Sequence, residues 1–286
     1  MHDILFHIRF GRMDLPIHSY GVMIMIGFLL GLFVARWRAR KVGMEPDHVT
    51  DLAIWALLGG IAGARILYII EFPREFNSIA DLFKIWKGGL VFYGGLIGAA
   101  IAAVFIIKRR RLQALNALDV LIPSVALGQA FGRIGCFLRG CCYGVPVSKD
   151  AWYGVIFPSP PACDVYSANT GIAEGTPLFP SQLVSSLNLL ALFVILTLYW
   201  RHRRRMGDVF ALYLILEAIQ RFAVEFYRGD HTAGQLSPAQ WVALVMFFAG
   251  LALYAAPRPA AAISALARTD KDKRDCKDRK DDGNNN

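Results

Sequence analysis

Three arginines stand in or beside hydrophobic sequence, where charged side chains are costly and are candidates for a functional site. Arg133 lies near the end of one hydrophobic segment, and Arg221 and Arg228 belong to the segment YLILEAIQRFAVEFYR. A guanidinium group binds phosphate oxygens through two parallel hydrogen bonds and stays charged at any relevant pH. If these arginines converge, they form a phosphate site at the depth of lipid headgroups.

Two carboxylates accompany the arginines in the same segment. Glu217, Arg221 and Glu225 are spaced four residues apart, so they drift by only about 40° per step around a helix and share one face. One interpretation is a ladder of structural ion pairs that holds helices together. The other is that the carboxylates orient the arginines toward a bound phosphate. The pattern by itself leaves both interpretations open.

Long hydrophobic segments must position these residues. Of the 286 residues, 55% are hydrophobic and 19% are charged, and the apolar residues come in blocks, which is not typical of a soluble domain. A block of about 20 residues crosses a bilayer core of about 30 Å as a helix. We count seven blocks, at 19–36, 49–71, 89–107, 117–137, 182–200, 208–227 and 237–256. The sequence therefore predicts an all-α integral membrane protein with seven transmembrane helices.

Basic residues predict the orientation of these helices, because cytoplasmic connections are enriched in Lys and Arg. Every second connection is basic, with clusters at 36–41, 108–111 and 201–205 and in the tail from Arg258. This alternation places the N-terminus outside and the C-terminus inside. The net charge of +9 is explained by these flanks, which anchor against anionic headgroups. We expect no nucleic-acid partner, since no binding module is recognised.

The chain is predicted to contain one membrane domain, residues 1–256, followed by a tail. The connection 139–181 is rich in proline and predicts a small, largely non-helical extracytoplasmic cap over the outer helix ends. Residues 1–18 lack a basic n-region, so we do not expect a cleaved signal peptide. Residues 257–286 have no apolar periodicity and many charges, which predicts a disordered cytoplasmic tail.

Residues 132–144, GRIGCFLRGCCYG, resemble the signature of the prolipoprotein diacylglyceryl transferases, whose usual form is close to G-R-x-G-N-F-x-N-G-E-x-x-G. Further matches follow the family's order along the chain: HSYGVMIMIGF at 18–28, GARILYII at 63–70, GGLVFYGGLIGA at 88–99, PSQL at 180–183, RFAVEFYR at 221–228 and GQLSPAQW at 234–241. The resemblance covers residues 18 to 256 and includes the family's seven-span layout with the N-terminus outside.

The resemblance implies a transferase that moves a diacylglyceryl group from phosphatidylglycerol to the lipobox cysteine thiol of a prolipoprotein. The products are a thioether-linked lipid and glycerol phosphate. The implied partners are phosphatidylglycerol, prolipoprotein signal peptides with a lipobox cysteine, and membrane lipids. The implied location is the bacterial cytoplasmic (inner) membrane. No cofactor is expected.

The resemblance also assigns roles to single residues. Arg133 matches the signature arginine, which contacts the phosphate of phosphatidylglycerol in the family, and Arg221 matches the second essential arginine, with Glu225 one turn on. Tyr20 matches the tyrosine of the first-span motif. Signature glycines, which let the chain turn and approach the lipid closely, match Gly135, Gly140 and Gly144.

This chain departs from the family at several positions. Tyr93 stands where many members have a histidine that is often assigned as essential. A phenol of pKa about 10 is a poorer base than an imidazole of about 6.5, so the identity of the base is open. Cys136 replaces the signature asparagine, Cys141 replaces its glutamate, Glu217 stands where a tyrosine is common, and residues 184–185 are Val-Ser instead of Tyr-Glu. These changes fit a cysteine-type subgroup of the family or a paralogue with altered chemistry.

The predicted site follows from these matches and departures. We predict that Tyr93 orients the substrate by a hydrogen bond, while the arginines favour the thiolate of the incoming cysteine. The predicted catalytic residues are Arg133, Arg221 and Tyr93. The predicted phosphatidylglycerol-binding residues are Arg133, Tyr20, Gly144, Arg221, Glu225 and Arg228.

Four cysteines are expected outside the membrane, where disulfides persist: Cys136, Cys141, Cys142 and Cys163. A bridge from Cys163 to Cys141 or Cys142 is one option. No metal is predicted, because the C-x4-C-C spacing is not that of a zinc motif and no histidine accompanies it.

Other classes of protein use some of the same features. A membrane thiol-redox protein would use the clustered cysteines, and a small-solute transporter would use intramembrane charges, although no repeated halves stand out in the sequence. A CDP-alcohol phosphatidyltransferase needs a multi-aspartate metal motif, whereas Asp119 is the only acidic residue deep in its hydrophobic block.

Overall fold

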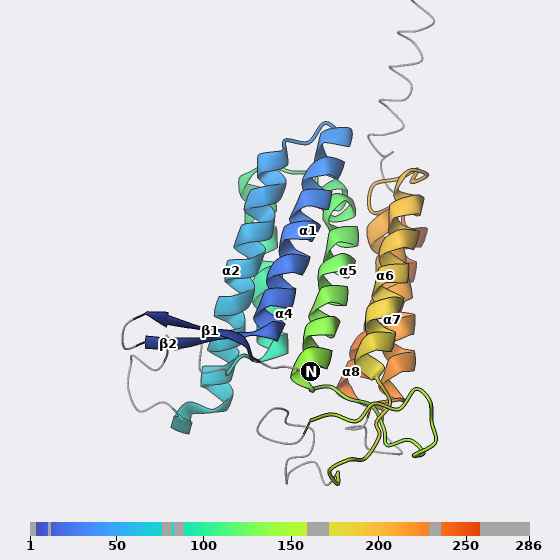
Figure 1. The fold of residues 1–286 in the computed structure, drawn as a ribbon. Coiled ribbons are helices and arrows are strands. Elements are labelled where there is room, and N and C mark those ends of the chain that lie inside the picture. The colour runs from blue at the N-terminus through green and yellow to red at the C-terminus, as the bar shows by residue number, and fades with distance from the viewer. Residues whose placement is uncertain are drawn as a thin grey trace, which may run out of the picture. The chain divides into compact units, whose positions relative to one another are not determined.

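The structure of the protein, a computed structural model, describes residues 4–10, 13–75, 82, 89–158, 172–228 and 236–257 (Figure 1). The chain divides into two compact units. The first comprises Met1–Val34 and Leu121–Asn286, and the second comprises Ala35–Val120. The predicted tail lies outside the described residues from 258 onward, so its disorder stays a prediction, as does the single membrane domain over 1–256.

Within the described ranges, seven α-helices have 18 to 26 residues: α1 (Ser19–Lys41), α2 (Pro46–Glu71), α4 (Phe92–Arg109), α5 (Ala114–Arg139), α6 (Ser181–Trp200), α7 (Asp208–Glu225) and α8 (Pro238–Ala255). They coincide with the hydrophobic blocks of the sequence. In this part of the chain, five helices are long and apolar enough to cross a membrane, namely α1, α2, α5, α6 and α8. The predicted helical membrane protein is confirmed at this level.

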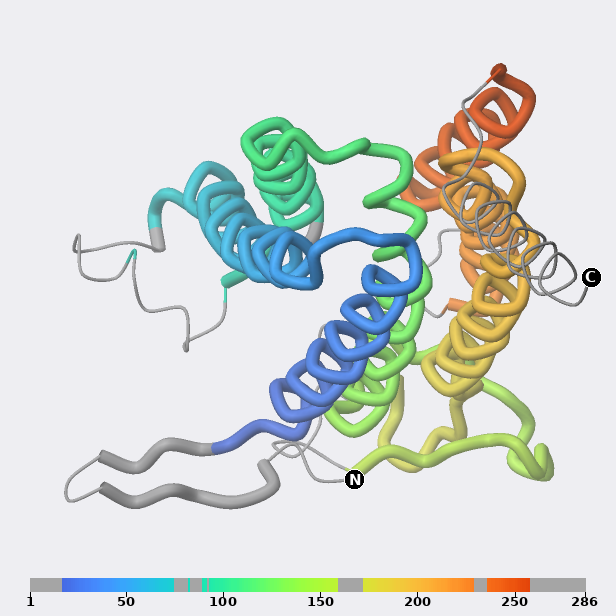
Figure 2. Tube along the Cα trace, turned by 90° about the horizontal axis from the view of Figure 1, so that it is seen from above, coloured from blue at the N-terminus to red at the C-terminus, as the bar shows by residue number. Residues whose placement is uncertain are grey.

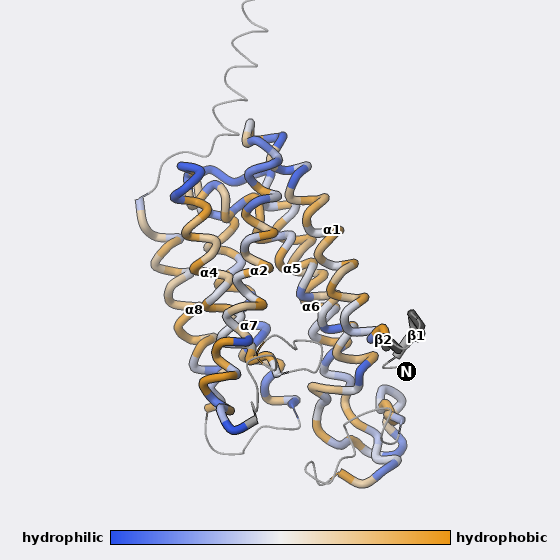
Figure 3. Tube along the Cα trace, turned by 90° about the vertical axis from the view of Figure 1, so that its left-hand side faces the viewer, coloured by the Kyte–Doolittle hydropathy of each residue, from blue (hydrophilic) through white to orange (hydrophobic). Residues whose placement is uncertain are grey.

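Large apolar side chains point outward from these helices. Phe33 of α1 is 71% exposed, Leu187 of α6 is 68% exposed and Val245 of α8 is 69% exposed. Figure 3 shows that the middle turns of the helices are mostly hydrophobic, while hydrophilic residues gather in the connections. Large apolar side chains exposed on several long helices agree with a membrane-facing protein, because in water such surface would promote association.

In the second unit, α2 and α4 lie side by side (Figure 2) and meet through glycines. A Cβ atom added at Gly63 would collide with the backbone oxygen of Gly94, and one at Gly98 would collide with the backbone oxygen of Gly59. In membranes, small residues let helices associate by close packing, since lipid provides no hydrophobic driving force between helices. The glycines therefore let α2 and α4 pack with their backbones in close contact.

Arg65, a charged residue late in α2, binds backbone carbonyls of the same unit. Its Nε donates a hydrogen bond of 3.0 Å to the carbonyl oxygen of Leu82, and its Nη1 donates one of 3.0 Å to that of Gly89. Both acceptors lie in the connection between α2 and α4, which begins with the short 3-10 helix η1 (Pro73–Glu75). Arg65 therefore holds this connection against α2.

A β-hairpin that the sequence analysis left out begins the first unit. Strand β1 (Ile4–Phe10) pairs antiparallel with β2 (Met13–His18), and α1 follows β2 directly. Among the described residues, the helical fold therefore includes a two-stranded sheet.

Helix α5, which carries the signature, is packed on two sides within the first unit. A Cβ atom at Gly27 of α1 would lie 2.8 Å from the Cβ of Phe131, so α1 crosses α5 closely. On α6, the Ser186 hydroxyl donates a hydrogen bond of 3.0 Å to the carbonyl oxygen of Ala130. These contacts fix the C-terminal half of α5, where Arg133 lies.

The predicted extracytoplasmic cap is described at residues 140–158 and 172–180, and these residues contain no helix. They form turns and isolated bridges, in which Leu178 pairs with Pro146 and with Val155. Leu178 and Phe157 are buried together and form a small apolar core. The position of this connection as a cap over the outer helix ends stays a prediction.

Candidate functional site

The signature segment turns sharply where α5 ends. Gly140 has a φ of 74°, and Cys142 has a φ of 61°, a left-handed conformation that is uncommon for residues other than glycine. The N–H of Gly140 bonds to the carbonyl oxygen of Phe137 at 3.2 Å, and the N–H of Cys141 bonds to that of Cys136 at 3.1 Å. These bonds cap the last carbonyls of the helix, and the chain folds back beside it.

The first turn of α6 holds this loop in place. The Ser181 hydroxyl donates a hydrogen bond of 2.9 Å to the carbonyl oxygen of Cys142, and the Gln182 Nε2 donates one of 2.9 Å to that of Cys141. Both donors are buried. Sequence reasoning missed this positioning role, although the segment PSQL that supplies both residues was matched to the family.

The last signature glycine allows the segment after α7 to lie against the loop. Gly144 bridges to Arg228, and its N–H donates a hydrogen bond of 3.0 Å to the carbonyl oxygen of Phe179. A Cβ atom at Gly144 would lie 2.6 Å from that oxygen and 2.7 Å from the carbonyl oxygen of Tyr227. The close approach brings Arg228 to the signature, and only glycine permits it.

We therefore expect Gly144→Ala to lose transfer activity and thermal stability, because the new methyl group displaces the backbone that carries Arg228. Gly132→Ala is the matched control on α5, since a Cβ atom there has no neighbour within 4 Å and alanine favours a helix by about 0.5–1 kcal/mol. The measurement is the unfolding temperature in detergent together with turnover. A Gly144→Ala protein as stable as the control would contradict the assigned contact.

The arginine cluster forms around Glu225. Arg221 Nη2 lies 3.0 Å from Glu225 Oε2, and Arg228 Nε lies 3.7 Å from the same oxygen. The Glu225 side chain is 8% exposed. The carboxylate therefore offsets part of the positive charge of the two arginines. The structure thus brings Arg221 and Arg228 together at Glu225, while the convergence of all three arginines on a phosphate stays a prediction.

Glu217 and Arg133 do not take part in these ion pairs. Glu217 accepts a hydrogen bond of 2.9 Å from Gln220 Nε2, so the ladder suggested by the four-residue spacing stops at Arg221. No carboxylate of the described residues forms an ion pair with Arg133. Its half-buried guanidinium therefore keeps its capacity for an anionic ligand.

Tyr20 lies beside the signature helix, on the first turn of α1. A Cβ atom at Gly135 would lie 2.9 Å from Cδ2 of the Tyr20 ring, so the signature glycine makes room for this side chain. Of the predicted site residues, Tyr20, Arg133, Gly144, Arg221, Glu225 and Arg228 all belong to the first unit. Tyr93 is an exposed residue of α4 in the second unit, and its part in the site stays a prediction.

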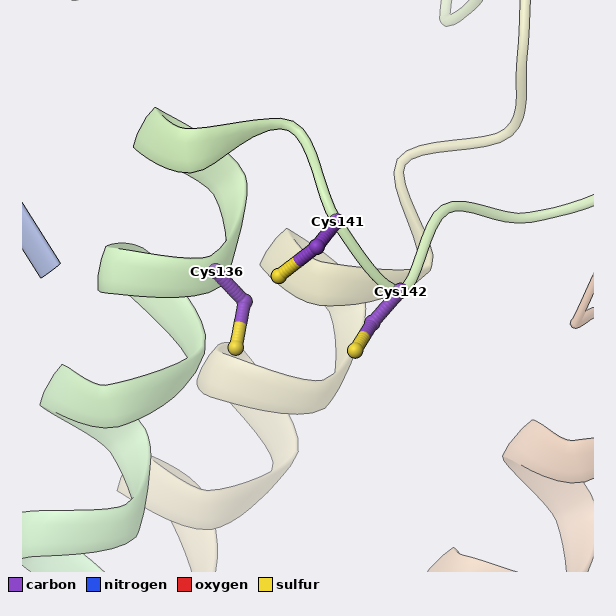
Figure 4. Close-up of side chains that lie close together, drawn as sticks. All are labelled: Cys136, Cys141 and Cys142. Atoms are coloured by element: carbon purple, nitrogen blue, oxygen red, sulfur yellow. The ribbon is translucent and has the colours of Figure 1, made fainter. Parts of the chain in front are cut away.

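Three cysteines face one another at the turn (Figure 4). The sulfur atoms of Cys136, Cys141 and Cys142 all lie within 4.8 Å of one another, and none is in a disulfide. The pKa of the Cys142 thiol is lowered by hydrogen bonds from Cys136 and Cys141 and by the charges of Arg228 and Arg133. The pKa of the Cys141 thiol is raised by its hydrogen bonds with the other two.

The sequence alone did not predict that these three thiols converge, because the left-handed turn that brings them together leaves no mark in hydrophobic periodicity. The C-x4-C-C spacing was the signal that could have found them. Cys163, the partner considered for a disulfide, lies outside the described residues.

The comparisons with known proteins all match this chain to the same family of enzymes. Residues 4–256 match the family model of prolipoprotein diacylglyceryl transferase. The chain is 36% identical over 249 residues to the phosphatidylglycerol–prolipoprotein diacylglyceryl transferase of Clostridium tetani, covering 86% of this chain and 96% of the relative. It is 33% identical to enzyme 2 of that name from Clostridium perfringens, covering 84% and 91%. It is 32% identical to the Burkholderia thailandensis enzyme, covering 83% and 89%.

Proposed function

The chain belongs to the prolipoprotein diacylglyceryl transferase family, and on that premise we propose that it transfers the diacylglyceryl group of phosphatidylglycerol to the lipobox cysteine thiol of a prolipoprotein. The observation that carries the proposal is the pairing of Arg221 and Arg228 with the buried Glu225, next to the signature loop that follows Arg133. Such a cluster suits the phosphodiester of phosphatidylglycerol, because it offers excess positive charge and forked donors.

The chemistry follows from the charges that develop. The cysteine thiol, of pKa about 8.5, loses its proton, and its sulfur bonds to the glyceryl carbon attached to the phosphate oxygen. The C–O bond breaks and its electron pair leaves with glycerol phosphate, so that negative charge gathers on the phosphate. Fixed arginines in a site poor in water stabilise this charge without reorganising. Arg133 and Arg221 are assigned this role, and Tyr20, Gly144 and Arg228 line the headgroup site.

The chain's place in the membrane is part of the same proposal. Seven spans with the N-terminus outside and the C-terminus inside put Arg133, Arg221 and Arg228 toward the outer leaflet of a bacterial cytoplasmic membrane. The alternating basic clusters support this orientation. Prolipoproteins exposed on that side would present the lipobox cysteine to the site.

The direct test is mass spectrometry of a lipobox peptide incubated with the purified protein and phosphatidylglycerol. We expect the peptide to gain the mass of one diacylglyceryl group, and the gain to resist thioester cleavage, because a thioether forms. A peptide with serine in place of the lipobox cysteine and a reaction with phosphatidylethanolamine alone serve as controls. No modification of the cysteine peptide by a folded protein would refute the proposal.

Tyr93 gives a prediction about the missing histidine. If Tyr93 orients the substrate by a hydrogen bond, Tyr93→Phe loses most activity and Tyr93→His restores part of it, because imidazole is a donor and a better base. The measurement is the pH–rate profile of both variants, in which Tyr93→His is expected to gain a rising limb near the pKa of histidine. Turnover of Tyr93→Phe at the wild-type rate with an unchanged profile would remove the phenol from the mechanism.

A further inference from the structure

The three thiols at the signature turn have no part in the chemistry described so far. Cys136 comes from the last turns of α5, and Cys141 and Cys142 follow it in the loop. Their sulfur atoms point toward one another (Figure 4) and lie within 4.8 Å of one another. Within the described residues they form a set of three soft ligands beside the arginine cluster.

The turn is built so that the thiols stay together. Cys142 adopts a left-handed φ of 61°, which a residue other than glycine keeps only where its surroundings over-determine it, often at functional sites. Buried hydrogen bonds from Ser181 and Gln182 hold the carbonyls of Cys142 and Cys141. Supporting contacts of this kind orient metal ligands in proteins.

Three thiolates in one place favour a soft or borderline cation, and zinc sites with three protein ligands keep an open fourth position that is used in catalysis. A closed structural site would instead need a fourth protein ligand. In the described residues, no histidine or carboxylate joins these cysteines as a further metal ligand. The set therefore matches an open zinc site rather than a closed one.

We propose that Cys136, Cys141 and Cys142 bind one zinc ion and that its open position takes the thiol of the incoming lipobox cysteine. This inference rests on the proposed transferase function. It adds a cofactor that the sequence did not predict. The zinc ion would favour the thiolate of the substrate, a role open to the histidine that many family members have at the position of Tyr93.

The chemical step then balances without a protein base. On binding zinc the substrate thiol releases its proton to water, since a metal-bound thiol is deprotonated outright. The thiolate sulfur forms the new C–S bond to the glyceryl carbon as the C–O bond breaks, and the electron pair leaves with glycerol phosphate. The thioether is a weak ligand and departs, which returns zinc to its three cysteines. Arg133 and Arg228 offset the negative charge of a zinc ion bound by thiolates.

Metal content of the full-length protein, purified in detergent under reducing conditions, is the first measurement. We expect one zinc ion per chain by elemental mass spectrometry, and its loss in Cys136→Ser, Cys141→Ser and Cys142→Ser. Cys276→Ser, in the tail, is the matched control and should bind as the wild type does. The proposal is overturned if the wild type binds no zinc, if two of the three thiols are found in a disulfide, or if Cys163→Ser also loses the ion, because a fourth thiolate would close the site.

Replacing zinc with cobalt tests whether the fourth coordination position of the metal is open. The readout is an absorption spectrum and does not depend on activity. Protein loaded with Co²⁺ should show thiolate-to-metal charge-transfer absorption, which intensifies and shifts when a lipobox peptide with cysteine is added. The peptide with serine should leave the spectrum unchanged. An unchanged spectrum with the cysteine peptide would overturn the open-site inference.

Different results would refute the zinc site and the transferase function. Transfer that persists after the metal is removed by a chelator would refute the zinc inference while the transferase function stands. A protein that binds zinc and shows the cobalt response, yet modifies no peptide with phosphatidylglycerol present, would refute transfer from this lipid and leave the metal site in place.

Discussion

Arg133→Ala is expected to abolish diacylglyceryl transfer while the protein still inserts and folds. Removing one preorganised donor to a developing negative charge lowers turnover by about a hundredfold to a thousandfold. The loss here should reach the upper part of that range, because Arg133 has no ion-pair partner among the described carboxylates. The measurement is the rate of peptide modification in detergent with phosphatidylglycerol.

Arg139→Ala supplies the matched control for this variant. Arg139 ends the same helix and is exposed, so its removal changes the net charge of the segment equally without touching the cluster. It should keep near wild-type turnover. Both variants should retain the helical circular dichroism of the wild type. Near-normal turnover of purified Arg133→Ala would contradict the phosphate-binding role.

Arg221→Lys distinguishes the two interpretations of the charged helix face. A lysine at this position keeps the positive charge beside Glu225, so a purely structural ion pair survives the change. An ammonium cannot reproduce the fork that holds two phosphate oxygens, and one lost hydrogen bond to a charged group costs about 1.5–3 kcal/mol. Turnover should therefore fall about tenfold to a hundredfold, with little change in unfolding temperature.

Glu225→Gln completes this test, because it removes the carboxylate and keeps the volume of the side chain. If Glu225 serves to hold Arg221 and Arg228 in position, this variant loses activity and the Michaelis constant for phosphatidylglycerol rises. Fully active Arg221→Lys together with a Glu225→Gln protein of much lower stability would instead establish the ion pairs as structural.

The helices and much of the site could be predicted from the sequence, for different reasons. Blocks of about 20 apolar residues are a strong signal for a spanning helix. The four-residue spacing of Arg221 and Glu225 predicted their pairing, because neighbours on a helix face are set by geometry alone. Gly144 was predicted as a point of close approach, and the contacts of its backbone explain why.

Other features depend on contacts between distant parts of the chain. Arg65 is a charged residue in a hydrophobic segment, and its donors bind two carbonyls of the α2–α4 connection, which no local pattern encodes. The β-hairpin did leave a signal, because Met13, Leu15 and Ile17 of β2 alternate with more polar residues. This alternation was not used in the sequence analysis. The three-thiol set depends on a turn in which Gly140 and Cys142 are both left-handed, and composition does not predict such a backbone conformation.

The glycine contact between α2 and α4 bears on how the protein is assembled during synthesis. Where Gly63 and Gly98 bring two backbones together, Cα–H groups can donate weak hydrogen bonds to carbonyl oxygens. This association requires no residue of α5 or the later helices. The two helices can therefore dock on each other while the ribosome is still translating the signature. The later helices, among them the charged α7, are then synthesised when a folded piece of the chain is already present.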